Sequence, residues 1–214
     1  PDVVSNDVTI CAGNTATLEV KTPQTGVTYR WYASATGGTV LHSGVQYTTS
    51  PLNKDTAYYV EAQVDSSNCI SLDRTLVQVH VTPLPAAPAL NVTSTTLCSG
   101  DSITLQVKNP VTGVTYKWYT ASTGGTAVFT GTTFTTPALT SNAAYYVEAQ
   151  TSGGCMSTSR TGVAITVNAL PAVPQLTADT VAVCYGATAT LQIKSPVTGT
   201  SYRWYLSPAG GSIL

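Results

Sequence analysis

The stretch Val27–Tyr32, which reads VTYRWY, decides the fold. Apolar and aromatic side chains occupy every second position in it, and polar side chains such as Arg30 stand between them. A period of two is the spacing of a β-strand with one buried face, so Trp31 is predicted to point into a core. Close copies at Val114–Tyr119 and Thr200–Tyr205 predict the same strand in three places.

Each copy belongs to a longer repeat. Three segments begin with Cys-x-Gly, pass through Lys-x-Pro and end at Trp-Tyr, namely Cys11–Tyr32, Cys98–Tyr119 and Cys184–Tyr205, spaced by 87 and then 86 residues. A second motif, Ala-Tyr-Tyr-Val-Glu-Ala-Gln, occurs at Ala57–Gln63 and again at Ala144–Gln150. Internal periodicity of this kind indicates tandem structural units.

The motifs divide the chain into units at residues 1–84, 85–171 and 172–214, the third stopping before its second half. Proline-rich stretches at Pro83–Pro88 and Leu170–Pro174 separate the units. Such stretches favour extended polyproline geometry and act as semi-rigid spacers, which indicates a stiff row of units.

Roughly seven short alternating segments fall within each unit of about 85 residues, with Gly, Pro and Asn turns between them and no helical period. We therefore predict an all-β chain of tandem immunoglobulin-like Greek-key sandwiches, the third incomplete. The half unit after residue 171 is expected not to fold alone, because three strands cannot bury enough surface.

The register between the two central strands can be predicted, because opposite residues of an antiparallel pair have a constant sum of residue numbers. The predicted pairs are Trp31 with Val60, Arg30 with Glu61 and Tyr32 with Tyr59, then Trp118 with Val147, Lys117 with Glu148 and Tyr119 with Tyr146. The outer face is then expected to carry a cross-strand ion pair beside an aromatic pair.

The run from Leu52 into the strand resembles the tyrosine corner of fibronectin type III and immunoglobulin domains. On that resemblance, the hydroxyls of Tyr58 and Tyr145 are expected to bond back to upstream backbone. Trp31 and Trp118 then take the buried tryptophan position of such sandwiches.

Five cysteines are present, and the repeat suggests one bridge within each complete unit, Cys11–Cys69 and Cys98–Cys155. Four cysteines allow three connectivities. A bridge between Cys69 and Cys98 would cross the linker and would be expected to leave Cys11 and Cys155 far apart. Cys184 is expected to lack a mate because its partner would lie beyond Leu214. Paired cysteines imply an oxidising, extracytoplasmic compartment.

Composition excludes several function classes. Only 9% of residues are charged, against roughly 25% in ordinary soluble domains, and 38 threonines take their place. The net charge of −1 offers no basic stripe for nucleic acid. No apolar run is long enough to span a bilayer, and the N-terminal residues do not resemble a signal peptide, so we expect the interior of a longer processed protein.

No constellation of catalytic residues is found, and no cofactor or metal is expected. The two histidines, His42 and His80, have Phe129 and Thr166 at the matching positions of the second unit. The paired glycines, such as Gly37-Gly38, stand between predicted strands and are typical of hairpin turns.

Outward tyrosines suggest one binding hypothesis. Tyr32 beside Tyr59, and Tyr119 beside Tyr146, could form flat platforms for sugar rings. The alternative is ordinary cross-strand packing, which we favour.

The motifs Cys-x-Gly, Trp-Tyr, Gly-Gly, Ala-Tyr-Tyr-Val-Glu-Ala and Val-x-Val together resemble the Ig-like repeats of large secreted surface proteins of Bacteroidota. The resemblance covers essentially the whole chain. Such repeats often precede gliding-associated or type IX secretion sorting domains, so it implies a secreted or cell-surface location and a role in adhesion, gliding or a stalk. It also suggests O-glycosylation at Asp-Ser/Thr-apolar motifs, which here would modify Thr56, Ser102 and Thr180.

The leading hypothesis is a non-enzymatic repeat segment of a large bacterial cell-surface adhesin. Its partners would be further Ig-like repeats of the same polypeptide, with a surface polysaccharide or a protein as a further ligand. The alternative is an accessory or carbohydrate-binding region of a secreted polysaccharide-degrading enzyme. A third reading is a receptor-like domain that binds a protein through its sheet edges.

Overall fold

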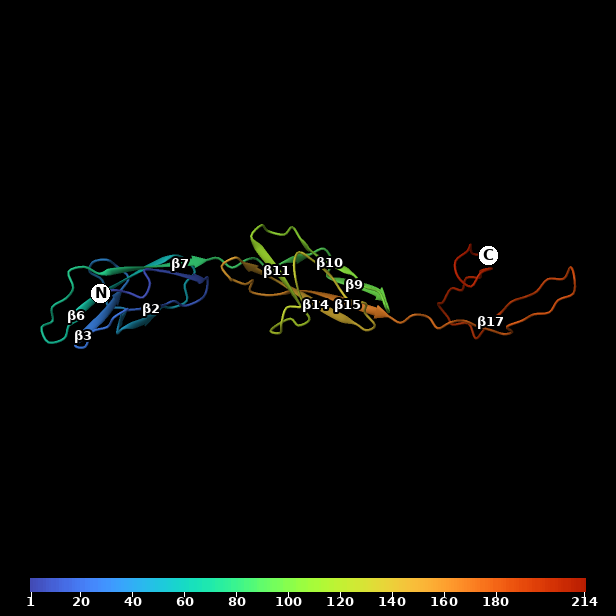
Figure 1. Cartoon of the computed structure of the whole chain (residues 1–214), viewed down its shortest axis with the longest axis horizontal. Coiled ribbons are helices and arrows are strands. Elements are labelled where there is room, and N and C mark those ends of the chain that lie inside the picture. Colours follow the sequence, from blue (N-terminus) through green and yellow to red (C-terminus); the bar gives the residue numbers. More distant parts are fainter.

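The computed structural model describes residues 1–214, and its regular elements are all strands. Two sandwiches follow one another along the long axis, and a loosely folded segment follows them (Figure 1). The prediction of an all-β chain of tandem sandwiches is confirmed. The structure contains no helix with the length and apolarity to cross a bilayer.

Repeat 1 contains seven strands. They are β1 (Asp7–Cys11), β2 (Thr17–Glu19), β3 (Val27–Tyr32), β4 (His42–Ser43), β5 (Gln46–Thr48), β6 (Thr56–Val64) and β7 (Thr75–Thr82). One sheet has the order β1-β7-β6-β3-β4, and β2 pairs with β5 in the facing sheet. β1 runs parallel to β7, while β6 runs antiparallel to both of its neighbours, β7 and β3.

Repeat 2 has the same plan. Its strands are β8 (Ala89–Leu90), β9 (Ser94–Cys98), β10 (Thr104–Lys108), β11 (Val114–Tyr119), β12 (Phe129–Thr130), β13 (Thr133–Thr135), β14 (Ala143–Thr151) and β15 (Thr161–Asn168). The two sheets have the orders β12-β11-β14-β15-β9 and β13-β10-β8. β9 again runs parallel to β15.

The predicted register of the central strands is confirmed at every pair. Trp31 lies opposite Val60, and Arg30 lies opposite Glu61 on the outer face. The β11–β14 pairing repeats this register in the second sandwich. A slip by one residue would exchange the two faces and expose Trp31, so burial of the tryptophan specifies the register.

Each sandwich has its own core of 11 buried residues. Trp31 is fully buried at the centre of the first core, and its indole Nε1 donates to the Gly44 carbonyl at 3.0 Å. Gly44 has a φ of 148°, and a Cβ there would lie 3.1 Å from the His42 ring, so the tight turn that presents this carbonyl favours glycine. Trp118 makes the same bond to Gly131 in repeat 2.

The expected tyrosine corner is wrong. Tyr58 and Tyr145 are buried, but their hydroxyls bond to no backbone group; their rings pack edge-on against Tyr47 and Phe134. The hydroxyl that accepts an upstream backbone N–H belongs to the tyrosine two residues before each tryptophan. Those bonds join Tyr29 to Gln24, Tyr116 to Val111 and Tyr202 to Val197. The corner is therefore built on the neighbouring strand.

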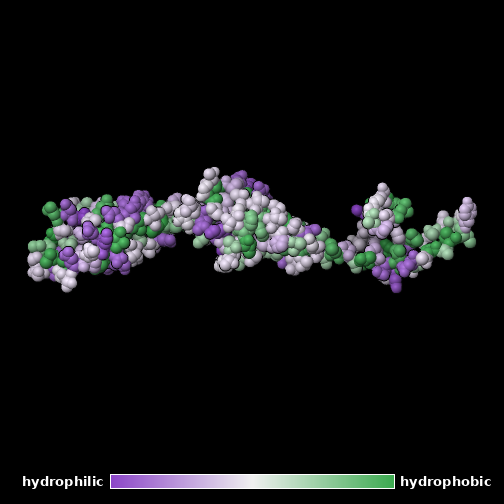
Figure 2. Space-filling view, viewed as in Figure 1, coloured by the Kyte–Doolittle hydropathy of each residue, from purple (hydrophilic) through white to green (hydrophobic).

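Residues after Leu170 form the short pair β16 (Gln175–Leu176) and β17 (Ile193–Lys194) and an isolated bridge between Tyr205 and Ile213. No residue beyond Ile165 is buried, and Trp204 is half-buried where Trp31 is fully covered. Figure 2 shows green, hydrophobic surface on this segment. Val183, Leu191 and Val197 are each at least half exposed. This half repeat therefore forms no core of its own, and that it does not fold alone stays a prediction.

Separate cores predict separate unfolding. Replacing Trp31 by Ala removes a fully buried side chain, so the free energy of unfolding of repeat 1 should fall by about 3–5 kcal/mol. The transition of repeat 2 should stay in place, because the two cores share no residue. Differential scanning calorimetry measures both transitions, and Trp204→Ala is the matched control that should shift neither. Equal shifts of both transitions in Trp31→Ala would mean that the repeats unfold as one unit.

Candidate functional site at the repeat junction

The outer face of repeat 1 carries a closed polar cluster instead of an open aromatic platform. The Tyr32 hydroxyl donates to Glu61 Oε1, and Arg74 Nε donates to Glu61 Oε2 at 3.0 Å. The Arg74 guanidinium lies over the Tyr32 ring, 3.3 Å from its centroid, and its Nη1 donates to the carbonyls of Ser34 and Gly37. Each group of the cluster therefore has a partner.

Repeat 2 reproduces the cluster. Tyr119 donates to Glu148, Arg160 Nε donates to the same carboxylate at 2.9 Å, and the guanidinium covers the Tyr119 ring at 3.3 Å. The carbonyls of Ala121 and Gly124 again accept from the arginine. In both complete repeats the carbonyl of the first glycine of the turn, Gly37 or Gly124, therefore accepts a hydrogen bond from an arginine.

Two sequence-based expectations fail here. Glu61 does not pair with Arg30, and Glu148 does not pair with Lys117, although the register places each pair side by side. The cation that binds each carboxylate is instead an arginine from the opposite side of β6 or β14, and its guanidinium also stacks on the neighbouring tyrosine ring. The sequence feature that could have identified these arginines is a repeated motif, Ser-x-x-Arg-Thr, at Ser71–Thr75 and again one repeat later.

The hypothesis of open sugar platforms at Tyr32 and Tyr119 does not fit the structure, whereas the favoured alternative of packing does. Both rings are buried beneath an arginine, with 5% and 7% of their surface exposed. Their neighbours Tyr59 and Tyr146 are half-buried. An aromatic surface for sugar stacking needs an open ring face, so cross-strand packing is the reading that the geometry supports.

The electrostatics of the cluster hold it in one protonation state. Burial alone would raise the pKa of Glu61, but hydrogen bonds from Tyr32 and Arg74 outweigh burial and lower that pKa below its ordinary value. Burial, assisted by Glu61, raises the pKa of Tyr32. The carboxylate therefore stays charged and the phenol neutral near pH 7, which is the pattern of a structural cluster.

The histidines do not form a repeated site. A hydrogen bond to Asp55 is the main cause that raises the pKa of His80 above its ordinary value, and Asp7 adds to it. Asp55 also accepts from the Val81 N–H, the main cause of its own lowered pKa. In repeat 2 that backbone bond goes to Asn142, and no histidine is present. His42 stacks on Tyr47.

The cysteine pairing differs from the expected one. Cys11 bonds to Cys155 of the next repeat, with the two Cα atoms 5.5 Å apart, within the usual range for disulfides. Cys69, Cys98 and Cys184 are unpaired and exposed. The expected bridges Cys11–Cys69 and Cys98–Cys155 are therefore wrong, and so is the expectation that Cys11 and Cys155 lie far apart.

Strand direction explains the pairing. Because β1 is parallel to β7, Cys11 lies beside Thr82, at the end of repeat 1 that enters the linker. Cys69 follows β6, which is antiparallel to β7, and so it lies at the opposite pole. The seven steps between the eight residues of β7, at about 3.3 Å each, place these poles roughly 23 Å apart, too far for a bridge.

The linker is packed at the same junction. Residues 83–89 line a groove of about 450 Å³ on repeat 2, together with Val114, Tyr116 and Ala149. The chain leaves the groove directly into β8, which pairs with β10, and the Thr161 hydroxyl donates to the Pro88 carbonyl. A disulfide, a packed proline-rich linker and a strand pairing thus meet where the two sandwiches join.

The arginine cluster yields a stability prediction. Arg74→Met leaves the Glu61 carboxylate nearly buried without its cation, so the free energy of unfolding of repeat 1 should fall by roughly 2–4 kcal/mol. Arg30→Met, the matched control, should change it by less than about 0.5 kcal/mol because Arg30 makes no ion pair. Guanidinium denaturation of the variants, followed by tryptophan fluorescence, measures both. If Arg30→Met lowered the free energy of unfolding more than Arg74→Met does, Arg30 and not Arg74 would be the ion-pair partner of Glu61, as the sequence suggested.

Two solved structures illustrate what this chain is similar to. The fibronectin(III)-like modules of Clostridium thermocellum CbhA match at 13% identity and a TM-score of 0.43, over 78% of this chain and 91% of that one. A marsupial T cell receptor matches at 12% identity and a TM-score of 0.46, over 81% of this chain and 75% of that one. No curated protein matches the sequence.

The profile of one family, described as the Ig-like domain, CHU_C associated, matches three times, at residues 1–83, 85–168 and 171–214. These matches cover nearly the whole chain. The chain therefore belongs to the family of Ig-like domains associated with CHU_C.

Proposed function

We propose that this chain is a stiff, non-catalytic spacer segment of a large bacterial cell-surface adhesin. Ig-like repeats of this family are structural or binding modules, which supports the non-catalytic part of the proposal. The observation that carries the spacer role is the Cys11–Cys155 bridge, which clamps two sandwiches that each already have a complete core. A clamp between folded units restrains their relative orientation, which is what a stalk requires.

The location follows from the same bond. A disulfide is maintained in an oxidising compartment, so we propose that the segment lies outside the cytoplasm, at the cell surface or in the medium. An adhesion or gliding role and a type IX secretion route are the corresponding proposals for the whole polypeptide. A carbohydrate-binding role for this segment receives no support from the outer tyrosines, because arginines cover them.

The spacer role can be tested by removing the clamp. In the wild-type chain, residual dipolar couplings from the two repeats should fit a single alignment tensor, because the bridge and the packed linker make them one body. Replacing both Cys11 and Cys155 by Ser should leave both cores folded and give two tensors of unequal magnitude. The matched control replaces Cys69 and Cys98 by Ser and should keep the single tensor. One shared tensor in the unbridged variant would rule out the clamp as the source of stiffness.

We also propose O-glycosylation at the Asp-Ser/Thr-apolar motifs. Ser102 and Thr180 are exposed, whereas Thr56 is half-buried and its hydroxyl donates to the Lys54 carbonyl. The first two hydroxyls are thus the better acceptors. The intact mass of the chain secreted from a Bacteroidota host should exceed 22.2 kDa and should return to that value in Ser102→Ala/Thr180→Ala. Thr56→Ala should keep the added mass, and an unmodified wild-type mass would contradict the proposal.

A further inference from the structure

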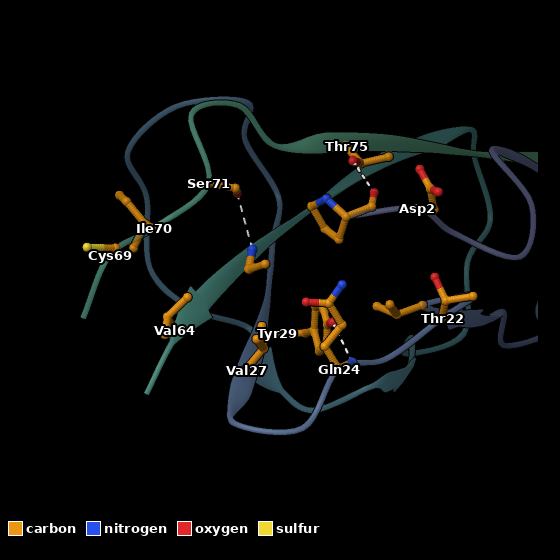
Figure 3. A pocket seen from close by; sticks show the side chains of 13 residues that line it. Asp2, Thr22, Gln24, Val27, Tyr29, Val64, Cys69, Ile70, Ser71 and Thr75 are labelled. Carbon is orange, nitrogen blue, oxygen red and sulfur yellow. Dashed lines mark hydrogen bonds between the residues drawn. The ribbon is translucent and has the colours of Figure 1, made fainter. Parts of the chain in front are cut away.

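The pole of repeat 1 that faces away from repeat 2 has the same construction as the face of repeat 2 that receives the linker. A groove of about 560 Å³ lies there, lined by Val27, Tyr29 and Ala62 among others. These residues match Val114, Tyr116 and Ala149, which line the linker groove of repeat 2. In Figure 3, Cys69 and Ile70 lie at one end of the groove and Asp2 lies at the other.

The loop that carries Cys69 is held as the bonded loop of repeat 2 is held. Val64 N–H donates to the Cys69 carbonyl, and Ser71 N–H donates to Ala62. In repeat 2, the equivalent bonds run from Thr151 to Cys155 and from Ser157 to Ala149. The two loops differ in the state of their cysteine. Cys155 is 2% exposed and bonded to the preceding repeat, whereas Cys69 is exposed and free.

The pole of repeat 2 that faces away from repeat 1 carries Cys98, the equivalent of the bonded Cys11. Cys98 ends β9 opposite Asn168, just as Cys11 ends β1 opposite Thr82. The backbone around it repeats too, since Asp101 N–H donates to Cys98 and Asn14 N–H donates to Cys11, each at 3.1 Å. Cys98 is free and exposed, beside the linker that leads away from repeat 2.

We propose that the groove and Cys69 form a docking surface for the linker pole of another repeat of this kind. Its proline-rich tail would lie along the groove of repeat 1, as residues 83–88 line the groove of repeat 2, and its strand-end cysteine would bond to Cys69. Cys98 would bond in the same way to the loop cysteine of a following repeat. Each repeat then contributes one cysteine to each neighbour, and no bridge lies within a repeat.

The chemistry is an ordinary two-electron oxidation. One Sγ–Sγ bond forms, two S–H bonds break, and two protons and two electrons leave. A disulfide oxidant such as oxidised glutathione accepts them and becomes two thiols. This inference concerns how repeats join, so it stands apart from any adhesive role of the whole polypeptide.

The test adds a neighbour to the full chain. A copy of residues 85–173, which comprises repeat 2 with its outgoing linker, is placed before Pro1, so that Pro1 takes the part of Pro174. The copied repeat 2 and repeat 1, which would meet at the new junction, each have a complete core in the present structure. After oxidation in a glutathione buffer, non-reducing peptide mapping should find the copied Cys98 joined to Cys69. The Cys11–Cys155 bridge is the internal control for correct junction chemistry.

The alkylation pattern gives a second readout. In the 214-residue chain, iodoacetamide should modify Cys69 and Cys98 without reduction and should leave Cys11 and Cys155 unmodified. Adding the neighbour should protect Cys69 to the level of Cys11, and Cys69→Ser should return the copied Cys98 to the free state. The proposal fails if Cys69 stays fully reactive while the Cys11–Cys155 bridge forms, or if the copied Cys98 pairs within its own repeat. Neither result would bear on the alignment-tensor test of stiffness.

Discussion

The parallel pairing of β1 with β7 is the constraint on which the organisation of this chain depends. It carries the first strand toward the linker and delivers Cys11 to the pole that faces the next repeat. Had β1 run antiparallel to β7, the same cysteine would lie at the pole of Cys69, and a bridge within the repeat would be in reach. Because of this strand direction, Cys11 forms its disulfide with the neighbouring repeat and not within its own repeat.

The central strands β3 and β6 supply the second constraint, because their register serves both faces of the sheet. On the inner face it seats Trp31 against Val60. On the outer face the same register brings Tyr32 to Glu61, where Arg74 closes the cluster. The tyrosine, glutamate and arginine of this outer cluster are consequently occupied by hydrogen bonds to one another, so they are not open to a ligand. The surfaces that set each repeat apart then lie at its two poles, which carry the cysteines and the grooves.

Three features meet at the junction, and each acts over a different range. The disulfide fixes one point across 144 residues of sequence. The linker lines a groove together with Tyr116, whose hydroxyl accepts a hydrogen bond from the Val111 N–H. The pairing of β8 with β10 ties the end of the linker to the second sheet. Together they restrain the relative orientation of the two sandwiches, which suits the proposed spacer role.

Much of the fold could be predicted from the sequence because alternation is a local property. The spacing of Val27, Tyr29 and Trp31 requires a strand with one buried face, and the copies of that spacing define the repeats. Matching the motif of β3 to that of β6 then yields the register, since only one register buries both apolar faces.

Only the tertiary structure decided which cysteines join and which cation meets Glu61. Both depend on what lies beyond a single strand pair: the direction of β1 relative to β7, and the approach of Arg74 from the other side of β6. Sequence spacing shows that cysteines and charges recur, but it does not show at which pole or beside which strand they emerge. Bridge formation and ion pairing require contact within a few ångströms, and that proximity is set by chain direction in three dimensions.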